Sequence, residues 1–369
     1  MQIIKTEDIL NSLRKVNDPD LNRDLVSLNM IRNIKIYDNT VSFDIVLTTP
    51  ACPLKGEIEE DCYNTVKNDF PSLSEIKINM TADVVSNINK QLSLILPGVK
   101  NTIAIASGKG GVGKSTVAAN IAVALAKEGA KVGLIDADIY GPSIPLMLGI
   151  KERPKVYQAG DSTKMIPVEN YGVKLMSIGF LVEDNAPVIW RGPMASGAVK
   201  QFMSDVEWEE LDYLLFDMPP GTGDIQLTLC QTIPLTGALI VTTPQEVSIA
   251  DARKALKMFT RVNVPIIGIV ENMSFFIAPD TGNKYDIFGS GGGERLAEEN
   301  STKFLGGIPI DQRVRIGGDT GIPIVYDMPD SEHAKIITQI TRNFSAQISI
   351  NNLTASAQPG MEILVGDDE

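Results

Sequence analysis

Residues 102–116 read TIAIASGKGGVGKST, and this stretch decides the fold. The β-branched and apolar run Thr102 to Ala106 predicts a strand, and a glycine-rich turn follows it. Apolar residues then recur at helical spacing, at Val117, Ile121 and Leu125. A strand, a GxxxxGKST loop and a helix in this order form a phosphate-binding loop, because backbone N–H groups and the helix N-terminus converge on one anion.

This loop predicts a site for ATP and Mg²⁺. Lys114 is placed to reach β- and γ-phosphate oxygens, and Ser115 to give its hydroxyl to magnesium. The alternative, a glycine-rich turn that merely precedes a helix, does not account for the complete motif. We expect nine consecutive residues to contact the nucleotide: Gly108, Lys109, Gly110, Gly111, Val112, Gly113, Lys114, Ser115 and Thr116.

Acidic residues end two later strands. The strand 131–135 runs into Asp136 and Asp138, and the strand 214–216 runs into Asp217. Ligands bind at the carboxyl ends of strands in open α/β sheets. Asp217 is therefore expected to hold magnesium through water, and Asp138 to direct the attacking water with support from Asp136. Alternatively, the Asp136–Asp138 pair is an ordinary turn.

A further strand, 266–270, is followed by Asn272. Its amide has both a donor and an acceptor, so it can read the adenine edge. Helical segments such as 247–260 alternate with these strands. The pattern predicts an α/β fold, a doubly wound and mainly parallel sheet with helices on both faces.

The first hundred residues predict a separate small α/β domain. A helix is expected from Thr6 to about Val16, strands over 30–36, 41–48 and 76–80, and a helix that begins at Pro53. The proline and glycine of 96–101 mark a linker. The expected divisions are thus a small domain over 1–96, an ATPase domain over 97–350 and a polar, acidic tail over 351–369.

Cys52 would then be the N-cap of the helix at Pro53, where the helix dipole favours a thiolate that binds soft metals. A buried structural cysteine is an equally good interpretation. Cys62, on the same helix, is expected to serve packing.

Composition limits the classes of partner. The chain has 369 residues, a net charge of −13 and a pI near 4.7, which argues against nucleic acid as a partner. No apolar run has the length of a membrane span, and the N-terminus has no features of a targeting peptide. Three widely spaced cysteines indicate the cytoplasm. The single histidine, His333, is expected on a helix surface.

Several motifs carry a resemblance to known families. The second lysine of the loop, Lys109, resembles the deviant phosphate loop of the MinD, ParA and Mrp ATPases, in which this lysine crosses a dimer interface to the partner's nucleotide. Residues 98–345 resemble the Mrp family as a whole, through GKGGVGKST, DADIYGPS (136–143), WRGPM (190–194), DMPPGTGD (217–224), ENMS (271–274) and FGSGGG (288–293). Asp18-Pro19-Asp20 and the stretch 48–53, TTPACP, resemble the small domain of cytosolic iron–sulfur assembly factors.

The resemblance implies an ATP-hydrolysing homodimer that carries iron–sulfur clusters and transfers them to apoproteins, with cluster scaffold proteins as further partners. Lys109, Lys114, Asp138 and Asp217 would be its catalytic residues.

One family motif is missing. Typical members have a CxxC after ENMS that holds a [4Fe–4S] cluster between subunits, and here its positions carry Ala278 and Thr281. Neither residue is a good ligand for a soft iron–sulfur centre. Cys230 is expected to be core packing, so Cys52 is the best remaining cluster ligand. The alternative is a MinD- or ParA-like scaffold that docks a partner protein without carrying a cluster.

Overall fold

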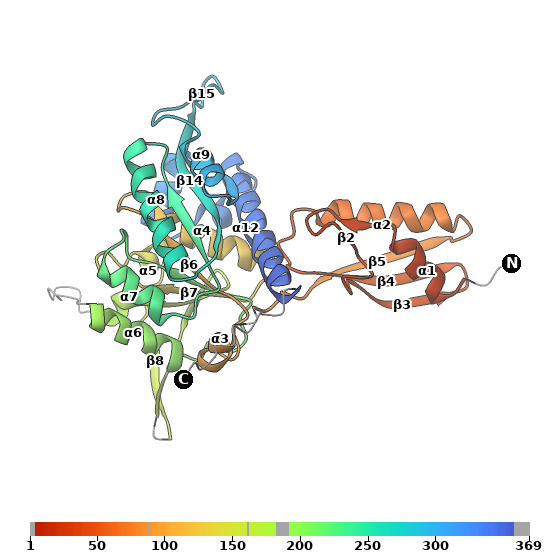
Figure 1. Ribbon diagram of the computed structural model, residues 1–369, viewed down its shortest axis with the longest axis horizontal. Helices are drawn as coiled ribbons and strands as arrows, with labels where there is room; N and C mark the ends of the chain where they lie inside the picture. The colour runs from red at the N-terminus through yellow and green to blue at the C-terminus, as the bar shows by residue number, and fades with distance from the viewer. Residues whose placement is uncertain (1–3, 88, 161, 182–191, 358–369) are drawn as a thin grey trace, which may run out of the picture.

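A computed structural model describes residues 4–87, 89–160, 162–181 and 192–357. The chain forms a large unit built on one broad sheet and a small unit that projects from its side (Figure 1). In the described residues, no helix is both long enough and apolar enough to cross a membrane.

The large unit is built on a nine-stranded sheet with the order β10-β11-β7-β12-β6-β13-β14-β15, in which β16 also pairs with β14. The strand of the phosphate loop, β6, lies in the interior between β12 and β13, and all five of its residues are buried. Every pairing from β11 to β14 and β16 is parallel, and only the short β10 and β15 are antiparallel. The expected doubly wound, mainly parallel sheet is confirmed. Its strands are β6 (Thr102–Ala106), β7 (Val132–Asp136), β10 (Val168–Asn170), β11 (Val173–Ser177), β12 (Tyr213–Asp217), β13 (Gly237–Thr242), β14 (Ile266–Ile277), β15 (Lys284–Tyr285) and β16 (Phe304–Ile310).

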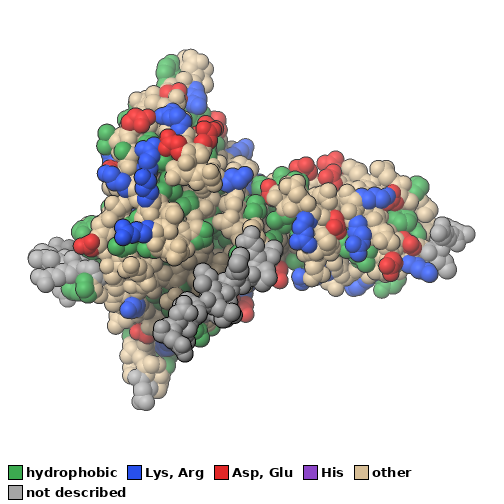
Figure 2. Space-filling view, in the orientation of Figure 1, with side chains coloured by type: hydrophobic (Ala, Val, Ile, Leu, Met, Phe, Trp, Pro, Cys, Tyr) green, Lys and Arg blue, Asp and Glu red, His purple; other side chains and the backbone are tan. Residues whose placement is uncertain are grey.

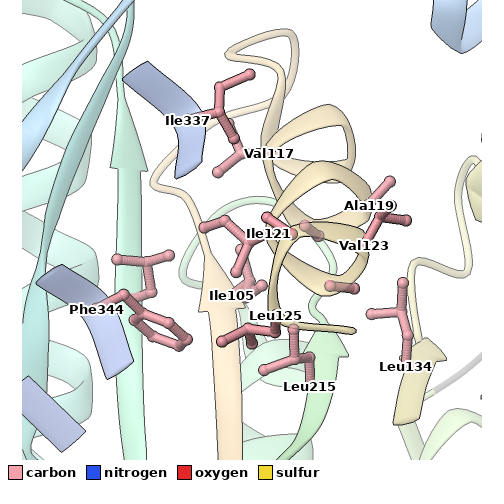
Figure 3. Packing of buried hydrophobic residues seen from close by; sticks show 14 of the residues in the cluster. Ile105, Val117, Ala119, Ile121, Val123, Leu125, Leu134, Leu215, Ile337 and Phe344 are labelled. Atoms are coloured by element: carbon pink, nitrogen blue, oxygen red, sulfur yellow. The ribbon is translucent and has the colours of Figure 1, made fainter. Parts of the chain in front are cut away.

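Helices cover both faces of this sheet, and each face has its own apolar cluster. Figure 3 shows the first cluster, in which Val117, Ile121 and Leu125 of α4 point at the sheet and meet Ile337 and Phe344 of α12. The helices of this face are α4 (Lys114–Lys127), α5 (Ile144–Met147), α10 (Gln312–Thr320), α11 (Ile324–Asp327) and α12 (Glu332–Ala357). The opposite face carries α3 (Lys90–Ile95), α6 (Gly192–Ser204), α7 (Asp224–Thr232), α8 (Glu246–Arg261) and α9 (Gly292–Glu299).

Several elements differ from expectation. β14 continues through Glu271–Ser274 instead of ending before them, with an irregular register against β16 and a positive φ of 54° at Met273. α12 extends to Ala357, so residues 351–357 are helical and not part of a tail. A hairpin of β8 (Lys155–Ala159) and β9 (Ser162–Ile166) and the 3-10 helix η1 (Ile178–Leu181) were not foreseen.

The small unit has a three-stranded sheet, β3 (Ile31–Tyr37), β4 (Thr40–Leu47) and β5 (Glu75–Ala82), with α1 (Thr6–Leu13) and α2 (Lys55–Asp69) packed on it. Two short strands, β1 (Asn17–Asp18) and β2 (Arg23–Asp24), pair in the loop after α1. The three main strands and two helices were expected. The start of α2 was not: Leu54 is its N-cap, so Pro53 and Cys52 precede the helix. α1 begins at Thr6 with Lys5 as N-cap, and it ends earlier than predicted.

The two units are joined by hydrogen bonds from α12 and β12. Ser345 Oγ donates to the Ala51 carbonyl at 2.9 Å and Ser349 Oγ to the Thr48 carbonyl at 3.2 Å. Tyr213, the first residue of β12, donates from its hydroxyl to Thr49 Oγ1 at 3.1 Å. The loop 48–51 is therefore fixed directly to the sheet of the large unit.

A second set of bonds at the junction centres on Asn352. Its Nδ2 donates to Asn101 Oδ1 at 2.7 Å and to the Val85 carbonyl at 2.9 Å, and its Oδ1 accepts from Asn87 Nδ2 at 2.7 Å. Leu92 of α3 is buried in the core of the large unit. We therefore propose that the division between the units lies before α3, not after it.

Candidate nucleotide site

Glycine conformation shapes the loop between β6 and α4. Gly113 is the N-cap of α4 with φ of +79°, and Gly111 has φ of +82°, a region that favours glycine. A Cβ at Gly113 would also clash with the side-chain amide of Asn272. That amide donates from Nδ2 to the Val112 carbonyl at 2.8 Å. Asn272 thus holds the phosphate loop from within β14, which lies two places from β6 in the sheet.

The predicted phosphate and magnesium side chains meet at one point. Lys114 Nζ lies 2.7 Å from Asp217 Oδ1 and 3.4 Å from Asp138 Oδ2, and Ser115 Oγ donates to Asp217 Oδ2 at 2.5 Å. These groups come from the start of α4 and from the ends of β12 and β7. These groups lie close together because parallel strands bring their carboxyl ends to the same edge of a sheet.

Burial and neighbouring charges together set the pKa values of Asp217 and Lys114. It raises the pKa of Asp217, although hydrogen bonds from Lys114 and Ser115 act in the opposite direction. Burial would lower the pKa of Lys114, but the neighbouring carboxylates of Asp217, Asp138 and Asp136 reverse this and raise it. Lys114 therefore remains an ammonium that can transfer its contact from a carboxylate to a phosphate oxygen.

Asp136 is fully buried beside this group, and burial together with the charge of Asp217 raises its pKa to about 8. Its Oδ2 accepts from Ser177 Oγ at 3.0 Å and from the Ile144 N–H at 3.2 Å. Asp136 therefore positions the start of α5 and the loop that carries Asp138. Ser177 was missed in the sequence, although its place at the end of a strand next to β7 is a signal of the kind that identified Asp136.

Lys109 takes no part in this cluster. Its side chain is exposed, and its carbonyl accepts from Ser107 Oγ at 2.9 Å. Gly110 and Gly111 are also exposed, so the outer side of the loop faces away from the protein. The site as a whole offers the N-terminus of α4, an ammonium, a hydroxyl and carboxylates, the set required for a nucleotide phosphate with magnesium.

Glu271, next to Asn272, is a buried acid that no sequence pattern singles out. Its Oε1 accepts from Ser274 Oγ at 2.6 Å, and its Oε2 accepts from the Gly293 N–H at 2.7 Å. Glu271 thereby ties the strand that carries Asn272 to the first turn of α9, which follows the FGSGGG stretch.

The three cysteines are separate and unpaired. Burial raises the pKa of Cys52 to about 11, and the charges of Asp18 and Asp20 add to this. The expectation of a dipole-stabilised thiolate is therefore wrong, because Cys52 precedes the helix and is largely buried. Cys62 and Cys230 are buried in the two cores, as predicted.

The family's cluster positions lie in the turn between β14 and β15. The Gly282 N–H donates to the Ala278 carbonyl at 2.8 Å, and the Asn283 N–H to Thr281 Oγ1 at 3.3 Å. This turn offers no thiolate, so a cluster does not fit there. Among the described residues, no three His, Cys, Asp or Glu side chains are grouped to hold a metal ion.

The prediction that His333 lies on a helix surface is wrong. His333 is buried rather than on the surface, with Nδ1 3.0 Å from Asp311 Oδ2.

Trp190 and Arg191 of the WRGPM motif lie outside the described residues, and Gly192–Met194 begin α6.

The fold and this site define a P-loop nucleotide-binding protein. The chain belongs to the family of iron-transfer P-loop NTPases: the model of the NUBPL iron-transfer P-loop NTPase matches residues 98–345. A second model, iron-sulfur cluster assembly protein, matches residues 6–80.

Relatives agree with this assignment. A Synechocystis protein named iron-sulfur cluster carrier protein is 50% identical over 350 residues, which are 94% of this chain and 99% of the relative. An Escherichia coli K12 protein of the same name is 43% identical over 342 residues, 92% of this chain and 91% of the relative. Among solved structures, a nucleotide-binding protein from Archaeoglobus fulgidus in complex with ADP is 41% identical, with a TM-score of 0.55, and covers 63% of this chain and 91% of that chain.

Proposed function

We propose that this protein is a cytoplasmic, ATP-hydrolysing homodimer that binds iron–sulfur clusters and transfers them to apoproteins. The observation that carries the nucleotide part is the convergence of Lys114 and Ser115 on the Asp217 carboxylate, with Lys114 Nζ at 2.7 Å and Ser115 Oγ at 2.5 Å. The cluster part is supported by family membership and by relatives of nearly equal length that are named cluster carriers.

Each residue of the site then has a role. The amides of 108–116 and Lys114 hold the phosphates, while Ser115 and Asp217 serve Mg²⁺. Asp138 directs water toward the γ-phosphate, and Asn272 meets the adenine edge. Lys109, exposed on the outer side of the loop, is free to reach a nucleotide in a second subunit.

The cargo requires ligands other than the absent cysteine pair. Cys52 is the remaining candidate, and two subunits together would supply two thiolates. Its raised pKa means that iron must displace the proton on binding, so loading is expected to improve with rising pH.

Anaerobic reconstitution tests this proposal. Iron and acid-labile sulfide per dimer are measured for the wild type, Cys52→Ser and Cys230→Ser, each with and without ATP. A cluster that is lost only in Cys52→Ser places the cargo at the small domain. If no variant holds iron and sulfide, the carrier role fails and the protein is a nucleotide-switched scaffold.

The scaffold remains the second candidate function, and the turn with Ala278 and Thr281 favours it. It predicts a partner protein bound only with ATP and no iron in the complex. Co-purification from an anaerobic extract, with iron analysis, separates it from the carrier.

A further inference from the structure

The two edges of the small sheet are different. At the β3 edge, the register against β4 shifts between Arg32 and Lys35, and Asn33 has a φ of +53°. Such bulges and charged residues protect an edge from further pairing. At the other edge, β5 pairs with β4 through eight consecutive residues without any shift. The outer side of β5 is therefore a straight strand edge, and no strand of the described chain pairs with it.

Burial shows that the core is incomplete at this edge. In β4, every second residue from Val41 to Leu47 is fully buried. The corresponding residues of β5, Ile76, Ile78 and Met80, are only half-buried. An additional strand beside β5 would complete their cover.

Helix α2 extends over the same edge. Gly56, Glu59, Glu60 and Tyr63 follow helical spacing, so they share one face of the helix. With Ile76, Lys77 and Ile78 of β5 they line a groove of about 550 Å³. The lining combines the apolar side chains of Ile76 and Ile78 with Tyr63, two carboxylates and Lys77.

The charge of the groove indicates its occupant. Glu59 and Glu60 are exposed and have no ion pair within the described part of the chain. The lysine of the lining, Lys77, is paired with Glu75 at 3.2 Å. Glu57 and Asp61 add negative charge on neighbouring faces of the helix, and Figure 2 shows acidic side chains along the edge of the small unit over α2. A basic segment is therefore attracted here. A second copy would bring two acidic helices together if it paired β5 with β5, which like-charge repulsion opposes.

We propose that β5 and α2 form a docking site for an extended, basic segment of a partner protein, which adds a fourth strand beside β5 and inserts an apolar side chain between Tyr63 and Ile78. Main-chain hydrogen bonds would supply affinity, and the groove and its carboxylates would supply selectivity, as in other cases of strand addition. This proposal concerns the small unit and does not depend on nucleotide or cluster chemistry.

The test uses the full-length protein and a blocked seven-residue peptide of alternating valine and lysine. Binding is measured by fluorescence anisotropy, and its place by hydrogen–deuterium exchange. We expect protection of residues 75–82 and weaker binding at high salt. A peptide of alternating valine and glutamate is the matched control and should not bind.

Two variants examine the groove without disturbing the fold. A Cβ at Gly56 would meet no atom within 4 Å, and Gly56 lines the groove, so Gly56→Phe should fold normally and place its ring in the groove. This variant should weaken peptide binding about tenfold, because the apolar side chain of the peptide can no longer enter the groove. The double variant Glu59→Lys/Glu60→Lys should also weaken peptide binding about tenfold. The double variant Glu57→Lys/Asp61→Lys makes the same change in charge outside the groove and should weaken peptide binding less than about threefold.

Specific outcomes would overturn the proposal. These are no protection of 75–82, unchanged affinity in Gly56→Phe, or equal losses in the two charge-reversed variants. If protection of 75–82 rises with protein concentration in the absence of peptide, a second copy occupies the edge and the proposed partner does not.

Discussion

Asp136 of β7 and Asp217 of β12 are register partners in adjacent parallel strands, and both carboxyl groups are fully buried. Two buried acids at this separation do not both ionise readily, which is why burial and the charge of Asp217 raise the pKa of Asp136 to about 8. Asp136 therefore releases its proton at a higher pH than an ordinary carboxyl group does, and this has consequences for stability.

The first prediction concerns pH. The pKa of Asp136 is above its ordinary value of 3.8, so between these two values the folded protein binds more protons than the unfolded chain. The contribution of Asp136 to stability is complete below about pH 4 and is lost as pH rises to about 8. Relative to Asp136→Asn, which does not titrate, the wild type should lose about 3 °C or more in Tm between pH 5 and pH 9.

The measurement is thermal unfolding of both proteins across this pH range. The exposed Asp330→Asn is the control, and it should follow the wild type at every pH. A constant difference between Asp136→Asn and wild type would show that Asp136 does not titrate in this range.

The second prediction concerns Lys114. Its ammonium is 95% buried among three carboxyl groups, so Lys114→Ala should remove their counter-charge and destabilise the protein by about 3 kcal/mol. ATP hydrolysis should fall at least about 100-fold, because the phosphate charge is no longer stabilised. Denaturant unfolding and a phosphate-release assay check both effects. Lys131 is exposed, so Lys131→Ala should change neither the stability nor the rate of ATP hydrolysis. Normal ATP hydrolysis by Lys114→Ala would refute the assignment of the site.

The third prediction concerns the proposed role of Lys109 in a second subunit. Lys109→Ala and Asp138→Ala should each be inactive alone. Mixed after mild dissociation, they should regain about a quarter of the wild-type rate, because half of the randomly paired dimers are mixed and each has one complete site of two. A mixture that stays inactive would mean that Lys109 acts within its own subunit, or not at all.

The fourth prediction concerns the junction between the units. Asn352→Ala removes the hydrogen bonds of a buried side chain to Asn101, Val85 and Asn87. The expected cost is about 2 kcal/mol, measured by denaturant unfolding. Protease sensitivity at residues 83–89 should rise at the same time. Asn351→Ala, a half-buried neighbour on the same helix, should cost less than about 0.5 kcal/mol and is the control.

The sequence predicted well what depends on local pattern and parallel topology. The phosphate loop, the buried strands and the meeting of Lys114, Ser115 and Asp217 follow from GKGGVGKST and from acids at strand ends. It failed where tertiary contacts decide. Asn352 is in a polar stretch and is nevertheless buried, because it pairs with asparagines some 250 residues earlier. His333 is buried by its bond to Asp311, which helical periodicity does not reveal.

The cysteine at the small unit shows the same limit. Pro53 is a good first helical residue by its chemistry, but α2 begins at Lys55 and Cys52 lies in the loop that joins the two units. A difference of two residues changes its environment from a helix N-terminus to a largely buried loop. Helix boundaries of this kind depend on packing between units and are not encoded locally.

The strand β12 runs from the junction between the two units to the nucleotide site. Its first residue, Tyr213, is bonded to the loop next to Cys52, and its last, Asp217, is bonded to Lys114 and Ser115. Five residues of extended chain span about 16 Å, with no turn or hinge between the two contacts. One continuous strand thus carries both the acid of the nucleotide site and the tyrosine that anchors the loop beside Cys52, so the two places share a single buried element of the sheet.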